Sequence, residues 1–321
     1  MMTIDSDPIQ LRIPTGAGRV TTGMETADAP NSGPFEARYL AFLETVTHLR
    51  PSLHRYCARM TGSVFDGEDV VQDALFQAYR RLDTFDDTQP LAPWLFRIAH
   101  NRCIDLIRRR SARDSAEADA VVPDLVDPAE PVGPLNRAVE HLVLTLPPME
   151  RACVLLKDVF DHSLEEIADV VGSTVGGVKS ALNRGRTKLA ARPNESQSRR
   201  QPNPEAIRIL QLYAERFNRR DWDGVRELIA ADAHLRVADR FAGLLTESPY
   251  FGRWEAWPVP WRVSVGVVDD EPVIMIDVSE TAGWKRRSVV RIDVESGLIR
   301  HVAEYLHCPW VLASSTVLPV S

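Results

Sequence analysis

Apolar side chains recur at helical spacing through most of residues 35–192. Val71, Leu75, Ala78 and Leu82 fall at i, i+4, i+7 and i+11, which places them on one face of a helix. The same spacing returns from residue 135 to residue 146, until the Pro147-Pro148 pair interrupts it. The pattern predicts two all-α domains, at residues 35–113 and 135–192.

Capping residues predict where several of these helices begin and end. Asp66 is the predicted N-cap of the helix that carries the first apolar stripe. Ser163 and Glu166 have the spacing of a capping box, and Gly172 is suited to end that short helix. Thr174 can then cap a second, basic helix. A short helix, a tight turn and a basic second helix predict a helix-turn-helix unit. Its second helix either enters a DNA groove or is an exposed basic helix without a partner, and this pattern alone leaves both open.

From residue 205 onward the pattern changes. Two amphipathic helical segments come first, and the stretches EPVIMIDV and SVVRIDVESGLIRHVAEYL then alternate β-branched with polar residues. The tripeptide Glu295-Ser296-Gly297 is a predicted hairpin turn. The prediction is a C-terminal α+β domain at residues 205–321, of ordinary size for one domain.

Three polar segments separate these units. Residues 1–34 mix Pro, Gly, Thr and Asp without periodicity and are predicted to be a disordered tail. Residues 114–134 contain four prolines, six acidic residues and no Lys or Arg, which predicts an acidic linker. A second linker is predicted at residues 193–204.

The composition narrows the class of protein. The 321 residues carry a net charge of −7, which argues weakly against a nucleic-acid partner because phosphate contacts need clustered Lys and Arg. The four cysteines form no CxxC or Cys/His pattern, which predicts a reducing compartment and no structural zinc. No cofactor is predicted. No apolar run is long enough to span a bilayer and no signal pattern opens the chain. We expect a cytoplasmic protein.

The segment WLFRIAHNRCIDLIRRR, residues 94–110, places several basic residues on one predicted helix. Leu95, Ile98, Ala99, Cys103 and Leu106 share one side of a helical wheel. Arg97, His100, Asn101, Asp105 and Arg108 share the other side, and Arg109 and Arg110 follow at the C-terminal end. The helix dipole favours cations at that end, so capping and phosphate contact are compatible roles for these arginines. The basic residues on this helix thus weaken the argument from net charge against a nucleic-acid partner.

Two motif-bearing stretches then resemble one family in type, order and separation. DGEDVVQDALFQAYRRL with WLFRIAHNRCIDLIRRR precedes the acidic linker, and LPPMERACVLLKDVFDHSLEEIADVVGS with VKSALNRGRTKL follows it. From about residue 35 to residue 191 the chain resembles the extracytoplasmic-function (ECF) class of bacterial sigma factors. The resemblance implies a protein without catalysis of its own that binds core RNA polymerase and promoter DNA.

The resemblance also implies roles for individual residues. The helix expected to dock on the polymerase carries Glu68, Asp69, Gln72, Asp73, Phe76 and Tyr79. The domain at 35–113 would recognise the minus-ten promoter element through Arg97, His100, Asn101, Arg108, Arg109 and Arg110. The helix-turn-helix would recognise the minus-thirty-five element through Thr174, Lys179, Ser180, Asn183, Arg184 and Arg186.

The recognition helix departs from the family pattern at three positions. Gly177, Ala181 and Gly185 stand where Thr, Arg and Ala are common. Two glycines in a helix cost about 1 kcal/mol each relative to alanine, and the missing arginine removes one expected phosphate contact. The promoter motif of this chain is therefore not implied by the resemblance.

The C-terminal domain resembles the SnoaL-like, NTF2-like cone fold, in which helices cover a curved sheet around a pocket. The resemblance rests on pattern over about residues 204–308 and implies modulation of the sigma domains, with an unknown small ligand as a candidate partner. The candidate pocket residues are Tyr213, His234, Asp277, His301 and Tyr305. Two alternatives stay open: a one-component DNA-binding regulator with a ligand-sensing domain, and a fused small-molecule isomerase or cyclase.

Overall fold

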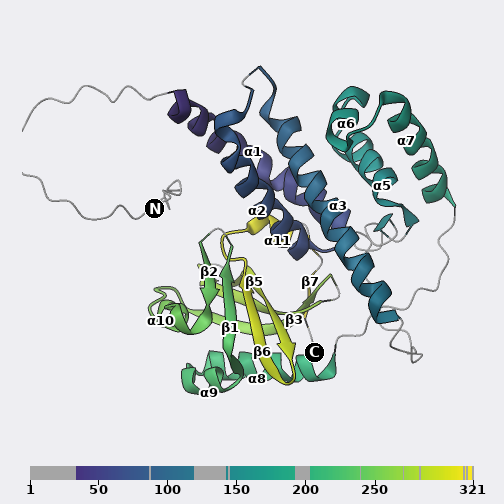
Figure 1. The fold of residues 1–321 in the computed structure, drawn as a ribbon. Helices are drawn as coiled ribbons and strands as arrows, with labels where there is room; N and C mark the ends of the chain where they lie inside the picture. Colours follow the sequence, from purple (N-terminus) through teal and green to yellow (C-terminus); the bar gives the residue numbers. More distant parts are fainter. Residues whose placement is uncertain are drawn as a thin grey trace, which may run out of the picture.

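The computed structural model describes residues 34–86, 88–118, 142–143, 145–191, 203–238, 240–269, 271–281, 283–313, 315 and 317–319. These residues form two helical domains and a C-terminal domain of helices and strands (Figure 1). The predicted fold class is confirmed. Most of the predicted tail, the greater part of the acidic linker and most of the second linker lie outside the described residues. Among the described residues, no helix is both long and apolar enough to cross a membrane.

The first helical domain comprises α1 (Pro34–Thr61), α2 (Val64–Arg80), a short 3₁₀ turn (Leu82–Thr84) and α3 (Leu91–Ala118). Ser63, not Asp66, is the N-cap of α2, because the Ser63 hydroxyl accepts from the Asp66 amide at 3.4 Å. The helix therefore begins earlier than predicted, and Asp66 lies inside its first turn. Helix α3 also continues past the predicted boundary at residue 113 to Ala118, over a stretch in which Ala116, Glu117 and Ala118 are good helix formers.

The second helical domain comprises α5 (Pro148–Val154), a π-helical turn (Leu155–Val159), α6 (Leu164–Val171) and α7 (Val175–Ala190). The predicted capping box is present, with Ser163 and Glu166 bonded reciprocally at 2.7 and 3.1 Å. Gly172 ends α6 at φ 65°, in the left-handed region that glycine tolerates. Thr174 caps α7 by accepting from the Gly177 amide at 3.1 Å. The helix-turn-helix prediction is confirmed.

The C-terminal domain begins with α8 (Pro204–Asn218) and α9 (Trp222–Glu227). Its strands are β1 (Ile229–Val237), β2 (Phe241–Leu244), β3 (Trp261–Val268), β4 (Glu271–Glu280), β5 (Gly283–Glu295), β6 (Leu298–Glu304) and β7 (Val317–Pro319). Two short helices, α10 (Tyr250–Glu255) and α11 (Pro309–Ala313), and a 3₁₀ turn (Leu245–Glu247) complete it. The sheet order is β2-β1-β6-β5-β4-β3-β7, with β1 and β6 parallel and the other pairs antiparallel.

The predicted hairpin turn is present between β5 and β6. Ser296 at φ 52° and Gly297 at φ 77° are its two central residues, which is the geometry of a type I′ hairpin turn. The turn places β6 in the middle of the sheet between β1 and β5. Strand β6 is therefore positioned to contribute side chains to both faces of the sheet.

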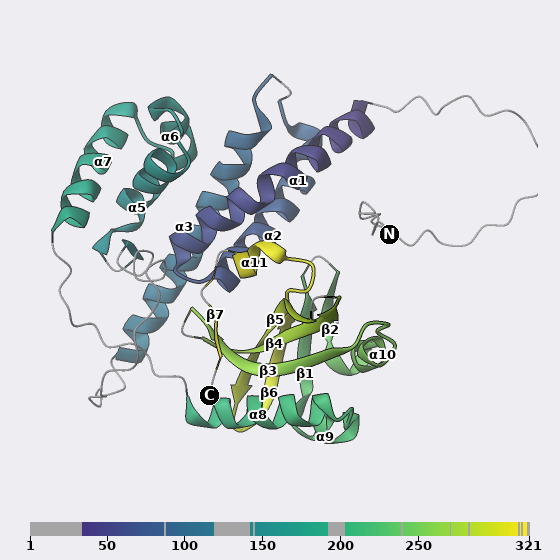
Figure 2. The ribbon, with the colours of Figure 1, turned by 180° about the vertical axis from the view of Figure 1, so that it is seen from behind.

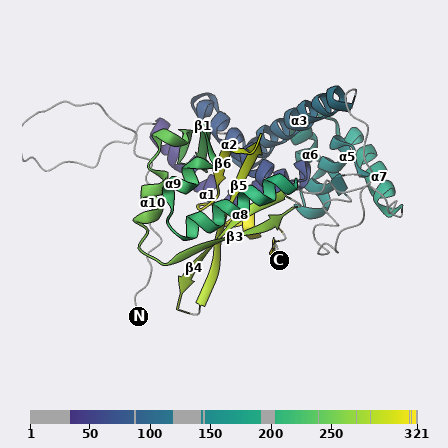
Figure 3. The same ribbon diagram turned by 90° about the horizontal axis from the view of Figure 1, so that it is seen from below.

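The two faces of the sheet have different covers. Helices α8 and α9 lie on one side, and the first helical domain with α11 lies on the other (Figure 2). Viewed from below, α8 crosses the sheet (Figure 3). The space under α8 is filled by large aromatic side chains, including Tyr213, Phe217, Tyr250, Trp254 and Trp261. This helix-covered curved sheet is the arrangement of the NTF2/SnoaL-like cone fold.

The two helical domains share a single apolar core. Phe96 of α3 lies 5.9 Å from Phe160 and 5.1 Å from His162, measured between ring centroids. Tyr56 of α1 also packs on Phe160, at 6.0 Å. The Arg151 guanidinium of α5 donates to the carbonyl of Met60, at the C-terminal end of α1. The helix-turn-helix domain is thus packed against α1 and α3.

Candidate DNA and polymerase surfaces

The predicted DNA face of α3 is largely solvent-exposed. Arg97, Asn101, Arg108 and Arg109 are exposed. Arg110 forms an ion pair with Asp66 at 2.5 Å, and its side chain remains 44% exposed. Four of the six predicted side chains are thus free to reach a nucleic acid, and Arg110 can exchange its carboxylate partner for a phosphate.

The prediction that His100 faces outward is wrong. Its side chain is buried, and its Nδ1 lies 2.9 Å from the Tyr56 hydroxyl. Burial lowers the pKa of His100 to about 4, so the ring is neutral at physiological pH. The reason is geometric: residue 100 lies one turn from Phe96 and Cys103, and α1 and the second domain together cover a wider stripe of α3 than the wheel allowed.

Helix α7 presents its predicted DNA side chains to solvent. Thr174, Lys179, Ser180, Asn183, Arg184 and Arg186 are all exposed. Two of them are held by carboxylates of their own domain: Arg184 pairs with Glu150 at 2.9 Å, and Arg186 pairs with Asp158 at 2.5 Å. These pairs fix the guanidinium groups without removing them from the surface.

The structure explains two of the departures from the family pattern. Ala181 is buried, so an arginine there would lie in the core and would not reach DNA. A Cβ atom on Gly185 would lie 2.9 Å from Cγ2 of Val154, which shows that glycine permits close packing of α5 on α7. The expectation of a lost phosphate contact at position 181 is therefore wrong.

The predicted polymerase surface of α2 is only half exposed. Phe76 is 65% exposed, Tyr79 is 42% exposed, and Asp73 is exposed as well. Gln72 is half-buried and donates to Glu68 at 3.4 Å. Glu68 itself is completely buried, and Asp69 is half-buried. The two carboxylates at the N-terminal end of this surface are covered by another part of the chain.

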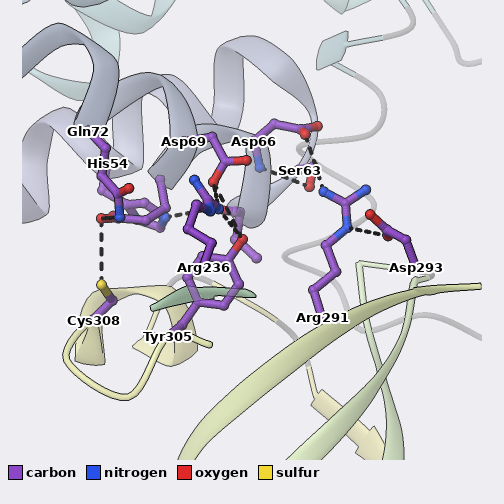
Figure 4. Close-up of polar contacts among 12 residues, drawn as sticks. His54, Ser63, Asp66, Asp69, Gln72, Arg236, Arg291, Asp293, Tyr305 and Cys308 are labelled. Atoms are coloured by element: carbon purple, nitrogen blue, oxygen red, sulfur yellow. Dashed lines mark hydrogen bonds and ion pairs between the residues drawn. The ribbon is translucent and has the colours of Figure 1, made fainter. Parts of the chain in front are cut away.

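The C-terminal domain provides that cover (Figure 4). Trp310 of α11 donates its indole N–H to Glu68 at 2.6 Å, while Arg50 of α1 pairs with the other oxygen at 2.5 Å. Arg236 of β1 forms an ion pair with Asp69, and the Tyr305 hydroxyl donates to the same carboxylate at 3.4 Å. Burial raises the pKa of Asp69 and Arg236 opposes that shift.

A second polar cluster lies beside the first. Arg291 of β5 faces Asp66 at 3.6 Å, Glu271 at 2.9 Å and Asp293 at 3.4 Å. The Val64 amide at the start of α2 donates to Asp269 at 3.1 Å. Burial raises the pKa of Glu271 to about 7, against the opposing effect of Arg291.

An apolar cluster joins the two polar clusters. Phe65 of α2 is completely buried, and its ring centroid lies 5.1 Å from that of Tyr305. Val64 and Ala58 contribute from the same side, and Val273, Met275, Val289, Cys308 and Val311 contribute from the C-terminal domain. The contact between the domains therefore has an apolar centre as well as ion pairs, as stable interfaces do.

The five candidate pocket residues are not gathered in one place. Tyr213 lies in the aromatic interior under α8, 3.3 Å from the Tyr250 hydroxyl. His234 and His301 stack on neighbouring strands and are exposed. Asp277 is held by Arg262 and Arg286 on the same face of the sheet as His234 and His301, and Tyr305 lies on that face in the contact with α2. Tyr213 instead has Tyr250 as its hydroxyl neighbour, and burial raises its pKa, with a contribution from the charge of Glu304.

Sequence reasoning missed the partners that decide this site. Arg236, Arg291 and Trp310 meet α2 from positions more than 160 residues away in the chain. Glu304, buried under α8 and paired with Arg253, was also missed; burial raises its pKa to about 7. No local pattern marks such contacts. Within the described ranges, no group of His, Cys, Asp or Glu side chains is arranged to hold a metal ion.

Comparison with known proteins matches both helical domains. The sigma-70 region 2 family model matches residues 45–113, and the sigma-70 region 4 model matches residues 136–189. The ECF RNA polymerase sigma factor SigG of Mycobacterium tuberculosis is 34% identical over an alignment of 238 residues, and the match covers 64% of this chain. The chain likewise spans 64% of the length of SigG, just under two thirds.

Two further comparisons concern a shorter relative and a solved structure. SigW of Bacillus subtilis, another ECF RNA polymerase sigma factor, is 32% identical over 162 residues, covering 46% of this chain and 87% of SigW. The crystal structure of the ECF sigma factor SigJ of Mycobacterium tuberculosis aligns at 16% identity with a TM-score of 0.33, over 84% of this chain and 98% of that chain. With both sigma-70 regions matched in order, the chain belongs to the ECF class of RNA polymerase sigma factors.

Proposed function

We propose that this chain directs core RNA polymerase to specific promoters and initiates transcription there. The observation that carries the proposal is the pair of separate, outward-facing basic helices, α3 and α7, in one chain. A helix of the α7 type enters a duplex groove, while the arginines of α3 suit a strand that has been separated from its partner. SigG and SigW, the relatives above, support the same role.

The closed packing of the two helical domains defines what must change before promoter binding. The minus-ten and minus-thirty-five elements lie about 25 base pairs apart, or about 85 Å along B-form DNA. Rings of α3 and of the second helical domain lie 5.1 Å apart in the structure. Because the second helical domain packs directly on α1 and α3 in the structure, we infer that the two domains move apart when the chain engages a promoter.

We infer that the C-terminal domain modulates this activity by protein contact rather than by catalysis. Its interior is filled with aromatic side chains, and of the candidate pocket residues only Tyr213 lies there, while the other four lie on the opposite face of the sheet. Its most extensive polar contacts with the rest of the chain are those with α2. A role at promoters would place the chain in the cytoplasm, where bacterial DNA lies.

Reconstituted transcription tests the proposal. Core polymerase purified from the source bacterium, free of sigma factors, is mixed with the chain and with fragments of the genome, and transcript start points are mapped. We expect initiation at a defined set of promoters. Retention of DNA by the chain without core polymerase, combined with no defined start point, would instead support a one-component DNA-binding regulator.

A further inference from the structure

We propose that the C-terminal domain and core polymerase compete for the same two carboxylates, Glu68 and Asp69 of α2. The inference rests on the proposed function, because it assumes that α2 docks on the polymerase. The inference names the groups that hold the C-terminal domain on α2. It also names the chemical groups that a polymerase surface needs in order to displace that domain.

The first step concerns charge. A buried carboxylate is stable only where donors and cations replace its lost water. For Glu68 those groups are Arg50 and Gln72 of the first domain, and the Trp310 indole and the Cys308 thiol of the C-terminal domain. For Asp69 they are Arg236 and the Tyr305 hydroxyl, both from the C-terminal domain. A surface that displaces the C-terminal domain has to supply equivalent groups to both carboxylates.

The second step concerns the apolar centre. Phe65 precedes the carboxylates on α2 and packs on the Tyr305 ring, among apolar side chains that come mostly from the C-terminal domain. Separation of the domains would expose the Phe65 ring unless another apolar surface takes the place of the C-terminal domain. In the closed chain the contact therefore combines paired charges, hydrogen bonds and buried apolar surface.

The third step concerns what remains accessible. Phe76 and Tyr79 lie two to three turns further along α2 and are not covered. An incoming partner can meet this exposed half first and reach Glu68 and Asp69 only when Arg236 and Trp310 release them. The polymerase surface that does so would carry a cation for Asp69 and a hydrogen-bond donor for Glu68, as the C-terminal domain does.

Competition has a quantitative signature. The apparent dissociation constant for a partner that binds only the open chain equals the intrinsic constant divided by the open fraction. The closed state is the one in which the C-terminal domain covers α2, and the open fraction is the share of chains in which it does not. Removing an ion pair from the closed state raises the open fraction and leaves the polymerase-facing residues of α2 unchanged. A variant of the C-terminal domain should therefore bind core polymerase more tightly than the original chain does.

The experiment measures the affinity of the full-length chain for sigma-free core polymerase of the source bacterium. Arg236→Ala is expected to tighten binding about tenfold or more, and Tyr305→Phe, which removes only a hydroxyl, about twofold to fivefold. Arg300→Ala is the matched control, because the ion-pair partner of Arg300 is Asp232 of the same domain. Its affinity should remain within twofold of the original.

Hydrogen exchange of residues 65–72 in the free chain gives a second readout that needs no polymerase. Faster exchange in both interface variants, but not in the Arg300 variant, would support the competition. Unchanged affinity and unchanged exchange in Arg236→Ala and Tyr305→Phe would overturn it while leaving the proposed function intact. Failure of the original chain and every folded variant to bind core polymerase would overturn the proposed function itself.

Discussion

Trp310 offers the sharpest energetic test of the contact between α11 and α2. Its indole N–H donates to the buried carboxylate of Glu68 at 2.6 Å, and the Arg50 guanidinium lies 4.9 Å from its ring centroid. Trp310→Phe removes the donor and keeps an aromatic ring. A hydrogen bond to a charged group contributes about 1.5–3 kcal/mol. The opening constant should therefore rise about 10- to 150-fold, at 1.4 kcal/mol for each tenfold change.

Hydrogen exchange under native conditions measures this opening directly, because amides of α2 that are shielded by the C-terminal domain exchange through it. The opening free energy of residues 65–72 should fall by about 1.5–3 kcal/mol in Trp310→Phe. Trp284→Phe is the control, since Trp284 is 47% exposed and stacks with Arg262 of the same domain. Equal exchange in both variants, at unchanged thermal stability, would refute the role assigned to the indole.

Three further predictions concern the individual domains. Gly185→Ala should lower the melting temperature of the chain, because its Cβ has no room against α5, whereas Gly176→Ala should raise stability by up to about 1 kcal/mol in thermal denaturation. Arg97→Ala should weaken DNA binding and lower by about one the slope of log binding constant against log salt concentration. Equal slopes for Arg97→Ala and the original chain would count against phosphate contact by Arg97. His100→Ala should instead lower the stability of the fold, because His100 is buried against Tyr56. Glu304 has a pKa raised to about 7 in the folded chain, so its contribution to stability is present below its unfolded pKa and is lost as pH rises toward 7. The free energy of unfolding, measured by urea denaturation, should therefore fall less over that pH window in Glu304→Gln than in the original chain. Part of the fall should remain in the variant, because the pKa of Glu271 is also raised to about 7.

Features that depend on neighbouring residues were predictable from the sequence. The capping box at Ser163, the left-handed Gly172 and the Thr174 cap each involve partners within about four positions, so the sequence contains all their determinants. The same holds for the turn at Ser296-Gly297. The basic faces of α3 and α7 followed from helical periodicity, since solvent covers the side opposite the core.

Features that depend on distant packing were not predictable in this way. His100 lies at the edge of the apolar stripe of α3, and the packing of α1 and of the second helical domain decides that it is buried. Asp69 and Arg236 are separated by 167 positions, and each alone reads as an ordinary surface charge. The candidate pocket residues were chosen by residue type, and strand register then placed His234, Asp277 and His301 on the face of the sheet away from the aromatic interior that holds Tyr213.

The most direct test compares hydrogen exchange in the free chain with exchange in its complex with core polymerase. If polymerase takes the place of the C-terminal domain, residues 65–79 of α2 stay protected in the complex while α11 and the end of β6 exchange faster than in the free chain. Unchanged protection of α11 around Trp310 in a complex that initiates transcription would contradict the competition, because the C-terminal domain would then still occupy Glu68.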